Sequence, residues 1–205
     1  MSKPIDDTAA ARHRAKMEKR KAVQDAEVAD KKIEKGLLIV HTGTGKGKST
    51  AAFGLALRML GRDKRVGVVQ FIKGAWHSAE RDALETFGDR VSWHTMGEGF
   101  TWDTQDLKRD IAAAERAWAK ANELMADPTI ALLILDELNI ALRYDYLDLH
   151  AVIKTFAARR RDLHIVVTGR NAKPELIAAA DLVTDMSLVK HHFAAGVKAQ
   201  PGIEF

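Results

Sequence analysis

The chain has 205 residues, of which 46% are apolar, and it contains no cysteine. This length suits one domain with a sizeable core, and the lack of cysteine excludes disulfides, cysteine-ligated zinc or iron–sulfur centres and thiol catalysis. No apolar run approaches the roughly 20 residues that span a bilayer, and no secretory hydrophobic region begins the chain, so we expect a cytoplasmic protein with no membrane partner.

The net charge of +4 is unevenly distributed. Residues 1–35 hold ten Lys or Arg and seven Asp or Glu, so the basic excess lies mostly there. Residues 8–35 contain no Pro or Gly and predict a helix without a core-facing apolar stripe, which should order only by docking on something. A nucleic-acid arm is the alternative to a solvated helix, but no aromatic interleaving or nucleic-acid motif accompanies the charge, and we expect no nucleic-acid partner. We therefore divide the chain into a charged helical segment, 1–35, and a domain, 36–205.

The domain alternates apolar strands with helices. Apolar runs predict strands at 37–40, 66–72, 91–94, 130–135 and 164–168, and 182–186 is a candidate for a sixth short strand. Helical patterns lie between them at 51–60, 79–87, 106–125 and 147–158, and a proline at 174 opens another helix. Such strands pair in parallel with helices on both faces. We expect a three-layer α/β sandwich whose mainly parallel sheet of five to six strands collects ligands at its carboxyl edge.

A glycine-rich loop joins the first predicted strand to the first predicted helix. Its residues are Gly43, Thr44, Gly45, Lys46, Gly47, Lys48, Ser49 and Thr50. Residues without a Cβ let backbone N–H groups form a concave nest for phosphate, and the helix directs its positive end at the anion. Lys48 adds a mobile charge, and the Ser49 hydroxyl can bind Mg²⁺. The usual spacing places a leading glycine at 42, which is threonine here, so the loop is one residue shorter.

Two acidic residues, Asp136 and Glu137, close the most apolar strand. A carboxylate at a strand end beside a phosphate nest can hold Mg²⁺, directly or through water. We assign Asp136 to Mg²⁺ and leave Glu137 open between metal ligation, water positioning and substrate contact. Lys46 is an extra charge in the loop, either a solvent-facing lysine or a group that neutralises a triphosphate. The loop and the acidic strand end together are typical of a P-loop NTPase, recombinase-like sandwich.

Phe100 and Trp102 stand two residues apart in a predicted loop at the carboxyl edge of the sheet. An isolated aromatic pair usually belongs to a core. Here flanking glycines and polar residues favour a surface loop, and an exposed aromatic pair beside a nucleotide site indicates a flat, apolar ligand. Five histidines lack the spacing of metal ligands and are expected to be structural: His77, His94, His164, His191 and His192.

Seven motifs in order along the domain go beyond a generic nucleotide site. They lie at 43–54, 68–74, 99–102, 135–138, 144–147, 167–170 and 189–200. These motifs closely resemble those of the CobA/CobO-type ATP:cob(I)alamin (corrinoid) adenosyltransferases. The resemblance runs from about residue 36 to residue 205, after a similar charged helical segment. Thr44 and Ser49 stand where Asn and Thr also occur in that family, and both keep the chemistry.

The resemblance implies that a Co(I) corrinoid, cob(I)alamin or cob(I)yrinic acid a,c-diamide, attacks the ribose C5′ of ATP and expels triphosphate. Lys46, Lys48, Ser49, Asp136 and Mg²⁺ would stabilise the leaving group, and Glu137 would join the catalytic site. The resemblance also implies that Phe100 and Trp102 displace the lower axial cobalt ligand, and that the N-terminal helix closes over the corrinoid. It further implies a homodimer and an external reductase that supplies Co(I). The alternative is a recombinase-like, ATP-dependent DNA-binding protein, which the same loop, acidic strand end and basic tail also suit.

Overall fold

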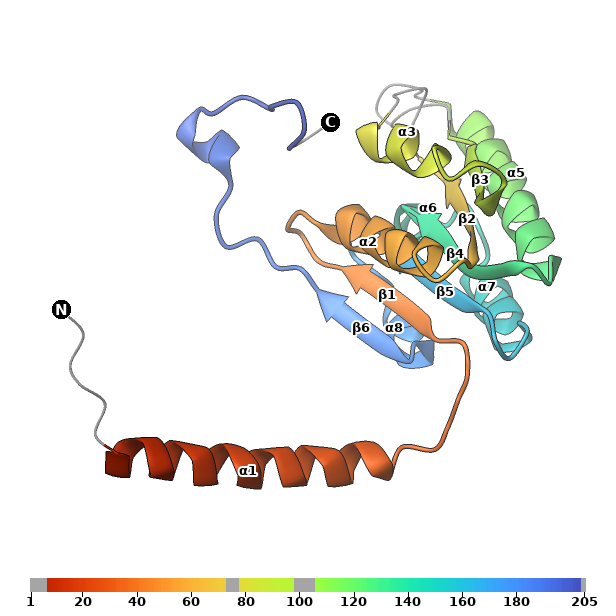
Figure 1. The fold of residues 1–205 in the computed structure, drawn as a ribbon. Coiled ribbons are helices and arrows are strands. Elements are labelled where there is room, and N and C mark those ends of the chain that lie inside the picture. The colour runs from red at the N-terminus through yellow and green to blue at the C-terminus, as the bar shows by residue number, and fades with distance from the viewer. Residues whose placement is uncertain (1–6, 73–77, 98–105, 204–205) are drawn as a thin grey trace. The chain divides into compact units, whose positions relative to one another are not determined.

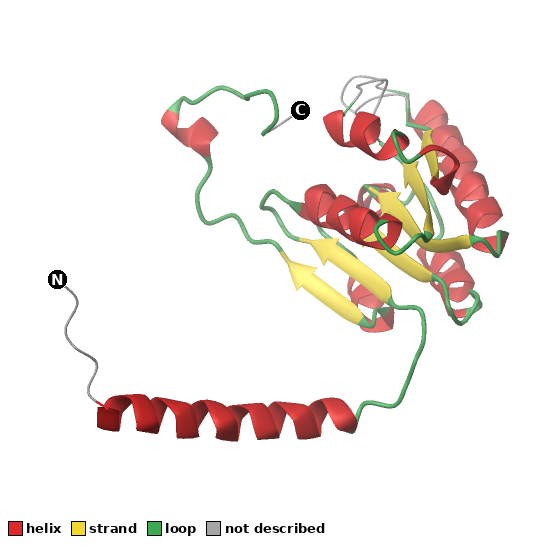
Figure 2. Cartoon of the chain, viewed as in Figure 1, coloured by secondary structure: helices red, strands yellow, loops and turns green. Residues whose placement is uncertain are grey.

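The structure is a computed structural model, and it describes residues 7–72, 78–97 and 106–203. The chain divides into two compact units, Met1–Glu34 and Lys35–Phe205. Figure 1 labels the elements of both units, and Figure 2 colours them by secondary structure.

The described part of the first unit contains one long helix, α1 (Asp7–Ala29). Helix formers without Pro or Gly explain the helix, and the apolar side chains of Val23 and Val28 are 54% and 65% exposed. The helix was expected to reach residue 35 but ends at Ala29. Lys35, which begins the second unit, is already held at the edge of the sheet, so the chain must leave the helix before it.

The second unit is built on a six-stranded, wholly parallel sheet. Its strands are β1 (Leu38–Thr42), β2 (Arg65–Gln70), β3 (Val91–Thr95), β4 (Ile130–Asp136), β5 (His164–Thr168) and β6 (Leu182–Asp185). Their order across the sheet is β3-β2-β4-β5-β1-β6, and every neighbouring pair is parallel. The predicted fold class is confirmed, including the sixth strand, and helices cover both faces of the sheet (Figure 1).

The helices divide between the two faces of the sheet. They are α2 (Lys48–Leu60), α3 (Ala79–Glu85), α5 (Leu107–Ala126), α6 (Leu138–Arg143), α7 (Leu149–Ala157) and α8 (Pro174–Ala179), with short 3-10 turns η1 (Gly88–Arg90) and η2 (His192–Ala195). Apolar side chains of α2 and α3 pack on one face, and those of α5 to α8 pack on the other. Helix α6, a single short helix directly after the acidic strand end, was not predicted.

The side chains of strand β4 contribute to the hydrophobic cores on both faces of the sheet. Leu132 and Ile134 belong to the core under α2, whereas Leu133 and Leu135 belong to the core under the helices of the opposite face. Successive side chains of a strand point to opposite faces, so a strand covered on both sides must be apolar throughout. The same logic makes its last residue, Asp136, stand out as a polar group at the carboxyl edge.

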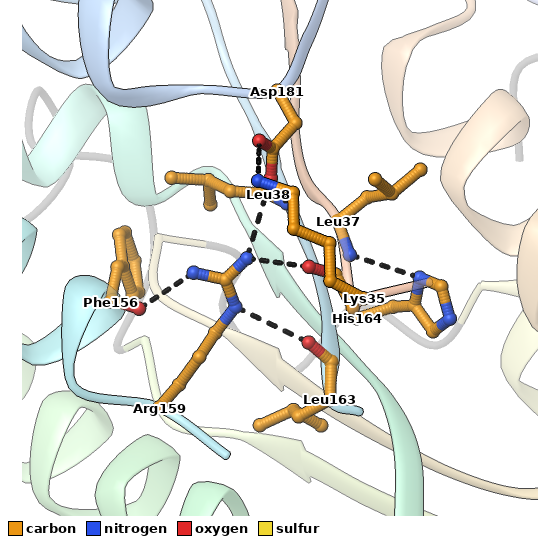
Figure 3. Close-up of polar contacts among 9 residues, drawn as sticks. Lys35, Leu37, Leu38, Phe156, Arg159, Leu163, His164 and Asp181 are labelled. Carbon is orange, nitrogen blue, oxygen red and sulfur yellow. Dashed lines mark hydrogen bonds and ion pairs between the residues drawn. The ribbon is translucent and has the colours of Figure 1, made fainter. Parts of the chain in front are cut away.

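A polar cluster fixes the chain where it enters β1 (Figure 3). The Asp181 carboxylate accepts hydrogen bonds from the Lys35 ammonium and, at 2.9 Å, from the Leu38 backbone N–H. Arg159 donates to the carbonyl oxygens of Gly36 (2.8 Å) and Phe156 (2.7 Å). These contacts tie the start of β1 to the neighbouring strands, so the loop at the far end of β1 begins from a fixed position.

Candidate active site

The glycine loop connects β1 to α2 at the carboxyl edge of the sheet, as predicted. Gly43 and Gly47 have φ angles of 98° and 103°, which favour glycine. A Cβ at Gly43 would lie 2.3 Å from Asp185 Oδ1, and one at Gly45 would lie 2.5 Å from the Met186 carbonyl oxygen. The loop therefore needs glycine both for its turns and for close packing against the segment that follows β6.

That segment was not expected at the site, because it lies about 140 residues further along the chain. The Gly45 N–H donates to the Met186 carbonyl oxygen at 2.6 Å, and the Met186 N–H donates to the Thr42 carbonyl oxygen at 2.9 Å. The side chain of Thr42, at the position where the usual spacing has glycine, accepts a hydrogen bond from the Ala172 N–H at 3.0 Å. The shorter loop is thus held on both sides by the β5 and β6 regions.

Lys48 begins α2 with its side chain buried inside the loop. Its side chain is 7% exposed, and Nζ donates to the Gly43 carbonyl oxygen at 3.0 Å and to that of Gly45. Burial lowers the pKa of the Lys48 ammonium below its ordinary value, and the nearby Glu137 carboxylate opposes that shift. Lys46, in contrast, is exposed on the same loop. The two lysines therefore offer charges in different settings, one buried and partly desolvated and one exposed to solvent.

Asp136 and Ser49, the two residues predicted to hold Mg²⁺, are in direct contact. The Ser49 hydroxyl donates to Asp136 Oδ1 at 2.7 Å, although β5 lies between β4 and β1 in the sheet. Thr168, at the end of β5, donates to the same oxygen at 2.7 Å. Asp136 is fully buried and accepts from side chains of three elements. Hydroxyl and carboxylate oxygens are the donor type that Mg²⁺ prefers, so this pair fits the ion.

Glu137 turns the chain sharply after β4. Its φ of 64° is unusual for a residue with a side chain, and its backbone N–H donates to Thr168 Oγ1 at 3.0 Å. The charge of its carboxylate opposes the lowering of the Lys48 pKa. Thr168 also donates to Asp136, so one threonine hydroxyl joins the Glu137 backbone to the Asp136 carboxylate.

Two further basic residues, Arg170 and His191, interact with the charges of the loop lysines, and the lowered pKa of His191 leaves its imidazole mostly uncharged at neutral pH. Partial burial, the neighbouring His192 and the charges of Lys46 and Arg170 all lower the pKa of the His191 imidazole. Arg170 also acts on the pKa of Lys48. The sequence predicted a structural role for His191 and gave Arg170 no role of its own. The signal for Arg170 was its place directly after the end of β5, where parallel sheets collect ligand-binding residues.

The aromatic pair Phe100 and Trp102 lies outside the described residues. Within the part of the chain that the structure describes, no group of three or more His, Asp or Glu could hold a metal ion by itself. Across the same residues, no helix has the length and apolar character needed to traverse a bilayer.

The fold and the site together define a class of protein. A parallel α/β sheet, a glycine loop with a buried lysine and a hydroxyl–carboxylate pair at the loop are the parts that hold the phosphates of a nucleoside triphosphate. The model of the ATP:corrinoid adenosyltransferase family BtuR/CobO/CobP matches residues 34–205, and a model of the cob(I)alamin adenosyltransferase N-terminal region matches residues 5–28. The chain belongs to the ATP:corrinoid adenosyltransferase family.

Individual relatives agree with that assignment. The chain is 56% identical over 194 residues to a corrinoid adenosyltransferase of Pseudomonas aeruginosa, covering 95% of this chain and 96% of the relative. It is 53% identical over 197 residues to a corrinoid adenosyltransferase of Sinorhizobium, covering 95% and 92%. A solved structure, the flagellar accessory protein FlaH of Methanocaldococcus jannaschii, aligns with a TM-score of 0.48 at 13% identity over 75% of this chain and 72% of that one, a likeness too distant to bear on function. The recombinase-like alternative has no support among these relatives.

Proposed function

We propose that this chain transfers the 5′-deoxyadenosyl group of ATP to the Co(I) centre of a corrinoid and releases triphosphate. The observation that carries the proposal is the buried Lys48 ammonium inside the glycine loop. The residue after it, Ser49, donates a hydrogen bond to Asp136. These groups converge where a polyphosphate would bind at the helix N-terminus. Family membership supplies the corrinoid as the second substrate.

The reaction needs no proton transfer to start. The electron pair of Co(I) forms a bond to the ribose C5′, the C5′–O bond breaks, and its electrons leave with the triphosphate oxygen, so cobalt becomes formally Co(III). The protein must align the two substrates and stabilise the departing polyanion. The positive groups near the loop, Lys48, Lys46 and Arg170, suit the second task.

We propose Mg²⁺ as the ion of this site, held by Ser49 with Asp136 behind it. Both Asp136 oxygens already accept hydrogen bonds from protein side chains, which favours an indirect role, in which the carboxylate orients the serine hydroxyl and bound water. Bound there, the ion would neutralise charge on the phosphate oxygens. Glu137 keeps the three roles left open above, and its place beside Lys48 favours contact with water or substrate at the loop.

We propose four further features because the chain belongs to this family. Phe100 and Trp102 would offer cobalt an apolar wall without a donor atom, which favours the four-coordinate state and eases reduction from Co(II). The N-terminal helix would close over the corrinoid. An external reductase would supply the electron, and the active form would be a homodimer in the cytoplasm.

Incubation with ATP, Mg²⁺ and chemically reduced cobalamin tests the proposal. A photolabile cobalt–carbon product and free triphosphate in equal amounts are expected. Release of phosphate or pyrophosphate instead of triphosphate, or no photolabile product, would contradict it. Omitting Mg²⁺ and adding a chelator tests the ion separately, since the proposal expects loss of turnover that Mg²⁺ restores.

A further inference from the structure

A buried glutamine, Gln70, lies one step behind the proposed magnesium site. It is the last residue of β2, its side chain is 2% exposed, and its amide Nε2 donates to Asp136 Oδ2 at 2.9 Å. The Ser49 and Thr168 hydroxyls donate to the other carboxylate oxygen. Gln70 thus holds the side of Asp136 that faces away from the phosphate loop's serine.

The orientation of the Gln70 amide is fixed by the neighbouring edge strand β3. Its Oε1 accepts from Trp93 Nε1 at 3.2 Å and from Thr95 Oγ1 at 2.9 Å. An indole N–H can only donate, so it must meet the amide oxygen, and the amide nitrogen is left to face the carboxylate. The two donors of β3 therefore decide which end of Gln70 reaches Asp136.

This chain of contacts has a consequence for Ser49. With Oδ2 held by Gln70 and Oδ1 by Thr168, the Asp136 carboxylate cannot rotate without losing a buried hydrogen bond. The Ser49 hydroxyl gives its single proton to Oδ1. Its lone pairs then point away from Asp136, as binding a cation requires.

We infer that Gln70 is a positioning residue for the magnesium–nucleotide site, set in place by Trp93 and Thr95 and acting through Asp136 on Ser49. The inference rests on the proposed function, because the role of Ser49 and Asp136 toward Mg²⁺–ATP is itself proposed. A purely structural role for Gln70 would lower stability without changing the dependence on Mg²⁺. Residues behind metal ligands commonly change metal affinity or activity by about 10–100-fold when replaced.

The test is a Gln70→Leu variant studied by calorimetric titration of ATP at a series of Mg²⁺ concentrations. The Mg²⁺ concentration that gives half-maximal tightening of ATP binding should rise about 10–100-fold. ATP binding without Mg²⁺ should match that of the wild type. Turnover should fall at low Mg²⁺ and recover in large part when Mg²⁺ is raised.

Matched variants separate positioning from stability. Val68→Ala lies two residues earlier on the same strand, where the valine is fully buried, and it should lower the melting temperature without changing the Mg²⁺ dependence. Introduced into the wild-type protein, Thr95→Val and Trp93→Phe should each raise the Mg²⁺ requirement. Introduced into the Gln70→Leu variant, they should not raise it further, because both act through the Gln70 amide. Trp93→Phe keeps an aromatic ring beside Phe53, which the tryptophan contacts at 5.1 Å between ring centres.

The possible results either support the role of Gln70 or overturn it. Wild-type Mg²⁺ dependence in a folded Gln70→Leu protein, or equal effects of Thr95→Val with and without Gln70, overturns the inference. Should Gln70→Leu not fold, Thr95→Val alone decides, and an unchanged Mg²⁺ requirement there overturns it. Failure of the wild type to bind Mg²⁺–ATP or to form the cobalt–carbon product overturns the proposed function instead.

Discussion

Replacing Lys48 with methionine removes the ammonium group and keeps an unbranched apolar side chain. The Lys48 side chain is 7% exposed, and Nζ makes two hydrogen bonds to loop carbonyls, so at least two donors are directed into the loop. A hydrogen bond to a charged group contributes about 1.5–3 kcal/mol. Two such bonds to the triphosphate contribute about 3–6 kcal/mol, which is a loss of about 10²–10⁴-fold in kcat/KM for Lys48→Met.

Initial rates of cobalt–carbon bond formation with pre-reduced corrinoid measure this loss, and thermal melting establishes that the variant is folded. Lys46→Met is the matched control, because Lys46 belongs to the same loop but is exposed. Water screens its charge, so its loss should stay below about tenfold. Lys48→Met activity within about threefold of wild type would refute the reasoning, and equal losses for the two lysines would show that burial does not rank them.

Three other changes test other parts of the chain. The double variant Phe100→Ala, Trp102→Ala should lose at least about tenfold more turnover in an assay that starts from Co(II) than in one that starts from pre-formed Co(I). Equal losses in the two assays would count against the axial-ligand role. Deleting residues 1–33 should weaken corrinoid binding and leave a cooperatively folding core, which calorimetry and circular dichroism measure; an unfolded product would make the segment structural. The Lys35 hydrogen bond, and then the Leu38 N–H, lower the pKa of the Asp181 carboxyl, so Asp181 stabilises the fold above its ordinary pKa of 3.8 and loses that contribution as pH falls through the lowered value. Asp181→Asn should therefore unfold about 1 kcal/mol more easily at pH 7, with a difference that shrinks toward pH 3 and below; a difference independent of pH would contradict the assignment.

The strands were predictable because the sheet is parallel. A strand covered on both faces reads as an unbroken apolar run, and Leu132, Leu133, Ile134 and Leu135 are a clear example. Even the exposed edge strand β6 was found as a candidate. The order of the strands was not predictable, because pairing between distant segments leaves no local pattern. The short helix α6 was missed because its six residues are too few to show a helical period beside the acidic strand end.

The site was predictable in its local parts. The loop, Lys48, Ser49 and Asp136 came from spacing along the sequence, and the structure places them in contact as expected. The packing of the loop against the segment after β6, including Met186, joins residues about 140 positions apart, so no spacing rule could reveal it. Phe100 and Trp102 lie outside the described residues, and their role stays a prediction.

A usable signal did exist for the residues that were missed around Asp136. Gln70, Asp136 and Thr168 are each the polar last residue of a strand and follow an apolar run, on the neighbouring strands β2, β4 and β5. Parallel strands bring their last residues to the same edge. Polar residues that close adjacent buried strands are therefore expected to bond to one another, once the strand order is known.

The distribution of polar groups agrees with a reaction whose nucleophile brings its own electrons. Co(I) attacks without a base, so the chemical demand on the protein falls on the charge that develops on triphosphate. On the proposed function, the positive groups near the loop, with Lys48 the most buried of them, would meet that demand by binding the triphosphate. Variants of the loop should therefore reduce turnover from Co(I) and from Co(II) alike, because both routes release the same leaving group. Variants of the aromatic pair should reduce turnover from Co(II) more than turnover from pre-formed Co(I), and this difference separates the binding of ATP from the preparation of cobalt.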